Sequence, residues 1–223
     1  MILETFWVYY IEFNLIVHNM EAEIYHKKTL ILNELLKIIP FEGCNDHALA
    51  IALDNAKLPR EYADLLFPAG IKDLFDFYAE ETIGKMIIKV NELTLDNMKI
   101  RDKILRSIQI LFAINLEHKQ ALKRMVAYFL IPTHVKQGFK LAWRAADKIW
   151  YNIGDKSVDY NFYTKRLILA KIISASFIFW LNDESDNYEN TEKFIAKKIA
   201  ATSKIGELKK IVKSIPFVRL LFR

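Results

Sequence analysis

The chain has little of what disulfide-stabilised, collagen-like or membrane-spanning proteins require. Among its 223 residues are one cysteine, Cys44, six glycines and five prolines. One thiol cannot form an intramolecular disulfide or a cluster of zinc-binding thiolates. The longest uncharged apolar run in the body, Ile172 to Leu181, is about half as long as a bilayer span requires, so it predicts a core or interface helix.

The composition that is present predicts a folded, all-α protein. Hydrophobic residues make up 52% of the chain, and from His26 onward their spacing is helical almost throughout, with no strand alternation of useful length. We expect three short helices. The first begins near Leu30 and is stopped by Pro40 and the turn residues Glu42 and Gly43, the second is capped by Asn45 or Asp46, and the third covers residues 60–66. Longer helices are expected over residues 71–95, 100–116, 119–130, 134–151, 159–181 and 188–201, with Gly154 as a left-handed cap after the helix that ends at Tyr151. Asp155, Ser157 and Asp159 are expected to hold a turn and a helix cap rather than to react.

The three short helices lie in residues 26–70, which is the size of a helix-turn-helix subdomain. DNA binding through such a unit depends on basic residues that neutralise phosphates. Between Phe41 and Phe67, however, Lys57 and Arg60 stand against five acidic residues, a net charge of −3. We therefore expect no nucleic-acid partner.

The formal charge of +5 is concentrated at the C-terminus. Residues 203–223 hold six of the 32 basic residues and one of the 27 acidic residues, so the first 202 residues carry 26 of each sign. Apolar residues recur there at helical intervals, which predicts a basic amphipathic anchor on a membrane surface. The alternative is a closing helix packed on the core with its lysines in solvent. The residues expected at the membrane are Lys209, Lys210, Lys213, Phe217, Arg219, Leu220, Leu221 and Phe222.

The first 19 residues are apolar and aromatic but are interrupted by Glu4, Glu12 and Asn14. They lack the basic start and the small-residue cleavage site of a secretory signal, so export is not expected. One interpretation is that the protein begins at Met20. The other is an additional helix with a face that docks on protein or lipid. That face consists of Phe6, Tyr9, Tyr10, Phe13 and Val17.

Motifs for catalysis are scarce. The chain has no G-x-G-x-x-G, Walker loop or H-E-x-x-H. Glu23 and His26 form one E-x-x-H motif, whereas a di-iron bundle needs two together with further glutamates. Glu42 and Asp46 flank Cys44 and disfavour a reactive thiolate. We therefore expect no catalytic residues, no metal and no cofactor.

Four segments resemble the ubiquinone-biosynthesis lipid-binding accessory family, also called the RpsU-divergently transcribed family. They are residues 39–43 (IPFEG), 66–70 (LFPAG), 143–151 (WRAADKIWY) and, most specifically, 154–166 (GDKSVDYNFYTKR). The resemblance runs from about Lys28 to the C-terminus and excludes residues 1–19. The chain departs from the family at Cys44, Tyr160 and Phe162, which are apolar-for-apolar changes that leave the expected fold intact.

The resemblance implies a TetR-repressor-like helical bundle with an N-terminal helix-turn-helix subdomain that no longer reads DNA. It also implies a homodimer whose cavity holds an isoprenoid lipid, and a partner, the di-iron demethoxyubiquinone hydroxylase. The family's partner patch corresponds here to Ile131, Pro132, Asp147, Trp150 and Tyr151. Candidate cavity residues are Phe112, Phe129, Trp143 and Phe177, although helical aromatic residues often belong to a plain core.

We therefore interpret the chain as a non-catalytic lipid-binding accessory protein of ubiquinone biosynthesis that presents a quinone intermediate to the hydroxylase. The alternative is a ligand-sensing TetR-type transcriptional repressor, which shares the fold. The expected domains are an extra segment (1–19), the helix-turn-helix subdomain (26–70), a lipid-binding domain (71–201) and the basic tail (203–223). We expect a cytoplasmic protein held peripherally at the inner face of the cytoplasmic membrane.

Overall fold

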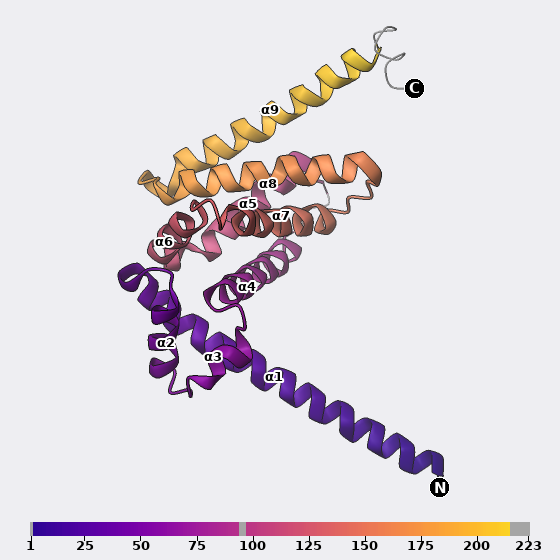
Figure 1. Cartoon of the computed structure of the whole chain (residues 1–223). Coiled ribbons are helices and arrows are strands. Elements are labelled where there is room, and N and C mark those ends of the chain that lie inside the picture. Colours follow the sequence, from indigo (N-terminus) through magenta and orange to yellow (C-terminus); the bar gives the residue numbers. More distant parts are fainter. Residues whose placement is uncertain (1, 94–96, 215–223) are drawn as a thin grey trace. The chain divides into compact units, whose positions relative to one another are not determined.

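The computed structural model describes residues 2–93 and 97–214 (Figure 1). These residues form nine α-helices and two 3-10 turns and contain no strand, which confirms the all-α prediction. The α-helices are α1 (Ile2–Glu42), α2 (Asp46–Asn55), α3 (Glu61–Leu66), α4 (Ile71–Asn91), α5 (Ile100–Ile114), α6 (Lys119–Phe129), α7 (Val135–Asn152), α8 (Asp159–Leu181) and α9 (Glu189–Ser214). The 3-10 turns are η1 (Leu116–His118) and η2 (Asp186–Tyr188).

The chain divides into two compact units, Met1–Tyr78 and Ala79–Arg223, and the division falls inside α4. The first unit contains the helix-turn-helix subdomain together with the first turns of α4. The second contains the rest of α4 and α5 to α9. Each unit has its own buried apolar residues.

Helix α1 is much longer than the sequence predicted. The expected start near Leu30 is wrong, because the helix begins at Ile2 and continues to Glu42. The physical reason is that the chain contains no glycine or proline before Pro40, so nothing interrupts the helix. Phe6 and Tyr9, two members of the expected N-terminal face, lie outside the residues whose side chains are described.

The turn signals of the first unit act as predicted. After α1 ends, Gly43 adopts φ +78° and its N–H donates to the Ile39 carbonyl at 3.0 Å. Asn45 caps α2, since its side-chain oxygen accepts a hydrogen bond from the Ala48 N–H at 2.8 Å. Arg60, one of the two basic residues between Phe41 and Phe67, is paired with Asp54 at 2.7 Å.

The second unit is a bundle in which α7 packs along α8, and α9 packs on α8 and α5 (Figure 1). Ile108, Ala146, Ile149, Trp180 and Ile195 form part of its buried core. The apolar run from Ile172 to Leu181 is the second half of α8. Ile172, Ile173, Trp180 and Leu181 are buried in the core, whereas Ile178 and Phe179 are exposed. None of the helices within residues 2–93 and 97–214 is long and apolar enough to cross a membrane.

Candidate functional site

The most specific segment of the sequence, residues 154–166, forms the turn from α7 into α8. Helix α7 ends in a Schellman motif, in which Gly154 N–H donates to the Tyr151 carbonyl and Asp155 N–H donates to the Trp150 carbonyl, both at 3.0 Å. Gly154 has φ +83°, a conformation that glycine adopts at little cost. This confirms the predicted left-handed cap at Gly154, and the motif fixes the backbone that carries Trp150 and Tyr151.

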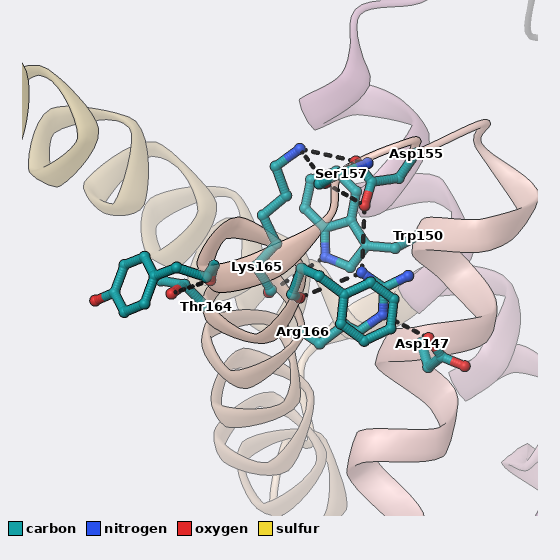
Figure 2. A network of polar contacts seen from close by, with 9 residues as sticks. Asp147, Trp150, Asp155, Ser157, Thr164, Lys165 and Arg166 are labelled. Atoms are coloured by element: carbon teal, nitrogen blue, oxygen red, sulfur yellow. Dashed lines mark hydrogen bonds and ion pairs between the residues drawn. The ribbon is translucent and has the colours of Figure 1, made fainter.

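Asp155 is the centre of a polar network (Figure 2). Its carboxylate accepts hydrogen bonds from Ser157 Oγ at 2.6 Å, Lys165 Nζ at 2.8 Å and Arg166 Nη1 at 3.2 Å. The Ser157 hydroxyl in turn accepts from Lys165 Nζ at 2.8 Å. The Asp155 side chain is only 5% exposed, so these donors take the place of water around its charge.

Arg166 connects this turn to α7. Its side chain is 4% exposed, and its Nε donates to Asp147 Oδ1 while Nη1 donates to Asp155. The guanidinium carbon lies 3.4 Å from the centroid of the Phe162 ring, and Nη1 also donates to the Phe162 carbonyl at 3.2 Å. A buried guanidinium needs such partners, because an unpaired buried charge is costly. Asp147, expected on the partner patch, is thus bound within the chain while its side chain stays partly exposed.

The electrostatics of Asp155 are those of a structural ion network. Burial by itself raises the pKa of Asp155, but hydrogen bonds from Lys165 and Ser157, the charge of Lys165 and a hydrogen bond from Arg166 lower it to about 2. Asp155 is therefore ionised at neutral pH. It lacks the near-neutral pKa that suits a general acid or base.

Trp150 lies against this network. Its Nε1–H donates to the Lys165 carbonyl at 3.2 Å, and Lys165 Nζ lies over the indole, 5.1 Å from the ring centroid. The indole is half-buried, whereas the adjacent Tyr151 is 77% exposed. The structure therefore places an exposed tyrosine beside a firmly held tryptophan, and aromatic anchors of this kind dominate many interfaces.

The other two patch residues lie elsewhere. Ile131 and Pro132 are exposed and follow the end of α6, just before α7 begins. Trp150 and Tyr151 lie at the other end of α7, whose 18 residues span about 27 Å at a rise of about 1.5 Å per residue. A partner that contacts all of these residues must lie along the length of α7.

Two of the four predicted cavity residues come together in the second unit. The rings of Phe112 and Phe177 are 5.5 Å apart, and Trp180 stacks on Phe112 at 5.3 Å. A pocket of about 340 Å³ adjoins this cluster and is lined by Phe112, Trp180, Tyr188 and nine further residues of α5, η1, η2 and α9. Trp180 was missed as a pocket residue from the sequence, although it lies one helical turn after Phe177 and is the last but one residue of the apolar run.

The other two predicted cavity residues do not join this cluster. Phe129 makes an edge contact with Tyr128 at 5.6 Å, and Trp143 contacts Phe139 at 6.4 Å. Neither lines the pocket next to Phe112. The helical pattern showed that these residues lie on helices, but it did not show which helix faces meet.

The basic tail is described only in part. Helix α9 continues to Ser214, so Lys209, Lys210 and Lys213 lie on its last turns, although their side chains are outside the described set. Phe217, Arg219, Leu220, Leu221 and Phe222 lie outside the described residues.

A family model described as COQ9 matches residues 135–206, which comprise α7, α8 and the start of α9. The chain is 28% identical over 192 residues to "Ubiquinone biosynthesis protein coq9, mitochondrial" of Schizosaccharomyces pombe, a match that covers 84% of this chain and 74% of that protein. The chain resembles the COQ9 family. This finding confirms the resemblance that residues 154–166 predicted.

Animal COQ9 proteins give the same result at lower identity. Identity is 24% to the Bos taurus protein and 22% to the Homo sapiens protein, each over 203 residues and 88% of this chain. The chain spans 63% of the length of each of these two relatives.

The fold also has a solved counterpart. "Crystal structure of the TetR transcriptional regulator from Nitrosomonas europaea ATCC 19718" matches with a TM-score of 0.63 and covers 79% of this chain and 97% of that chain. Its sequence identity is 14%, so the likeness shows the fold alone. The predicted TetR-repressor-like helical bundle with an N-terminal helix-turn-helix subdomain is confirmed.

The predicted location is wrong. The COQ9 relatives from fission yeast, cattle and human are named as mitochondrial proteins, which contradicts a cytoplasmic protein at the inner face of the cytoplasmic membrane. The inference failed because a single cysteine excludes an intramolecular disulfide but does not distinguish one thiol-reducing compartment from another. A basic amphipathic segment likewise predicts a membrane surface without indicating which membrane.

Proposed function

We propose that this chain is a non-catalytic, lipid-binding accessory protein of ubiquinone biosynthesis. It acts as a homodimer at a membrane surface and presents an isoprenoid quinone intermediate to the di-iron demethoxyubiquinone hydroxylase. The observation that carries the proposal is the similarity to COQ9 proteins over 84% to 88% of the chain, because those relatives are named for ubiquinone biosynthesis.

The aromatic cluster of the second unit supports lipid binding. Phe112 and Trp180 line a pocket of about 340 Å³, and Phe177 packs against both of them from outside its lining. Small-molecule sites occupy about 300 to 1,000 Å³. Each buried methylene of a prenyl chain contributes about 0.8 kcal/mol. The tail of the ligand therefore supplies the affinity, and the chemistry of its ring is left to the hydroxylase.

The lipid arm of the proposal is tested by extraction. The protein is purified without detergent from membrane-containing cells, and the lipids released by organic solvent are identified by mass spectrometry. Stoichiometric isoprenoid quinone or precursor supports the proposal, and a folded protein without lipid contradicts it. Ala113→Phe, which places a ring at the pocket wall, should lower the lipid content, whereas Ala127→Phe, at an exposed position outside the pocket, should not.

The proposed binding of the hydroxylase depends on Trp150 and Tyr151. Tyr151→Ala removes a mostly exposed ring and should leave the fold intact, while Trp150→Ala also removes a hydrogen bond to the α8 backbone. We expect each change to weaken binding to the purified hydroxylase by at least about 30-fold, the effect of losing an interface hot spot of about 2 kcal/mol. Phe41→Ala, in the first unit and more exposed than Tyr151, is the control. Unchanged affinity of the folded Tyr151→Ala variant, measured by titration calorimetry, argues against this patch.

The likeness to a solved TetR regulator favours a second candidate, a ligand-sensing repressor. The charge of the helix-turn-helix segment opposes it, since Arg60 is already paired with Asp54 and the segment is net acidic. A titration with duplex DNA at low and moderate salt separates the two candidates. We expect no salt-sensitive binding, and sequence-specific binding would replace the accessory role with the repressor.

A further inference from the structure

The N-terminal half of α1 carries an apolar stripe that has no role in the proposed function. Phe13, Ile16, Val17, Met20 and Ile24 follow one another at intervals of one, three and four residues, which places them on one side of the helix. The side chains of Phe13, Ile16, Met20 and Ile24 are between 42% and 65% exposed. These five residues form the α1 stripe. The stripe lies outside residues 135–206, which the family model matches.

The edges of the α1 stripe are acidic. On a helix with about 3.6 residues per turn, Glu12 and Glu23 fall beside one edge of the stripe and Glu21 falls beside the other. All three are exposed, and residues 10–25 contain no lysine or arginine. The nearest cation, Lys27, is paired with Glu23 and also donates to the Tyr62 hydroxyl at 3.0 Å.

These charges argue against a lipid surface as the occupant. Helices that lie in a membrane interface carry lysine and arginine on their polar face, which attracts them to anionic lipids. The α1 stripe has the opposite sign along both edges. The basic, membrane-seeking character of this chain belongs instead to residues 203–223.

The same charges argue against a second copy of the stripe. Paired helices select partners through opposite charges beside the apolar seam. Two α1 stripes, in either direction, bring Glu12, Glu21 and Glu23 against one another with no basic residue between residues 10 and 25 to compensate. Like charges at such positions are destabilising.

We propose that the α1 stripe is a docking surface for a different protein that presents an amphipathic helix with an apolar face flanked by lysine and arginine. Apolar anchors at helical spacing suit packing between two amphipathic helices. The acidic edges supply the complementary charge, which steers association and fixes the register of the two helices.

The test uses the full chain and a labelled helical peptide whose leucine stripe is flanked by lysines. The matched peptide has the same leucines flanked by glutamates. We expect the lysine peptide to bind at least about tenfold more tightly in fluorescence anisotropy, with an affinity that falls as salt is added. Met20→Asp should weaken binding about tenfold or more. Leu15→Asp, which adds the same charge at a similarly exposed position across the helix, should not.

Four results would each overturn the proposal. Equal binding of both peptides, or equal effects of Met20→Asp and Leu15→Asp, removes the role of the stripe. Binding to vesicles of anionic phospholipid that Met20→Asp abolishes assigns the stripe to a membrane. Self-association in sedimentation that Met20→Asp abolishes assigns it to a second copy. Circular dichroism of both variants confirms that α1 is retained in each.

Discussion

Replacing Asp155 by asparagine tests the central charge of the α7–α8 turn. The substitution keeps the size of the side chain but leaves Lys165 and Arg166 without their shared carboxylate. Removing one partner of a buried ion pair costs about 3–5 kcal/mol. Arg166 keeps Asp147 as a partner, so we expect a loss of about 2–3 kcal/mol in the free energy of unfolding at pH 7.

The pH dependence of this loss follows from the lowered pKa of Asp155. The fall from 3.8 to about 2 stabilises the folded state by about 2.5 kcal/mol at pH 7, at about 1.4 kcal/mol per pKa unit. Because the folded pKa is depressed, this stabilisation is present above the unfolded pKa and is lost as the pH falls from about 4 through about 2. The stability difference between the natural chain and Asp155→Asn should therefore shrink by about 1 kcal/mol between about pH 6 and about pH 3.

The assay is urea unfolding followed by two signals. Tryptophan fluorescence reports mainly on the second unit, because three of the four tryptophans lie there, and far-ultraviolet circular dichroism reports on the helices of both units. Asp54→Asn breaks an exposed ion pair in the first unit and should cost less than about 1 kcal/mol. If the difference in the free energy of unfolding between the natural chain and Asp155→Asn is constant from about pH 6 to about pH 3, the lowered pKa of Asp155 does not contribute to stability and the reasoning is refuted. An Asp155→Asn cost as small as that of Asp54→Asn would refute the buried ion network itself.

The remaining predictions concern backbone positions. Gly154→Ala should lower the free energy of unfolding by about 1 kcal/mol, because φ is +83° at this position although an added Cβ meets no atom within 4 Å. Gly84→Ala is equally uncrowded but lies inside a helix, so it should raise the free energy of unfolding by about 0.5–1 kcal/mol. Urea unfolding of both variants checks the opposite signs. Asn45→Ala should lose about 1 kcal/mol through the missing cap of α2, while Asn45→Asp should retain most of it; an equal loss for both would show that the cap is not the cause.

Helix ends were predictable from the sequence because each has a local chemical signature. Asn45 caps α2, and Gly43 and Gly154 turn the chain at positive φ, as their residue types indicated. The start of α1 was missed for the complementary reason. Residues 1–29 differ from the following residues in composition, which suggested a boundary. They contain no glycine or proline, so the helix continues through this change in composition.

The candidate site was only partly predictable, because its contacts join residues that are far apart in sequence. The segment 154–166 indicated a turn at Asp155 and Ser157, which the structure contains. The link from Arg166 to Asp147 spans 19 positions and has no periodic signature. The contact of Trp180 with Phe112 likewise joins residues far apart in sequence, which is why Trp180 was not predicted as a pocket residue.

The Trp150–Tyr151 patch and the α1 stripe differ in charge. Because of this difference, binding at the two surfaces should respond differently to salt. In the network beside Trp150 and Tyr151, the carboxylates of Asp147 and Asp155 are balanced by Lys165 and Arg166. Screening by salt weakens interactions between exposed charges but leaves contacts between desolvated aromatic rings largely unchanged. Hydroxylase binding through the aromatic pair should therefore depend weakly on salt, whereas binding to the acidic-edged α1 stripe should depend on it strongly. A salt-sensitive hydroxylase complex that survives Tyr151→Ala but not Met20→Asp would move the hydroxylase from α7 to α1.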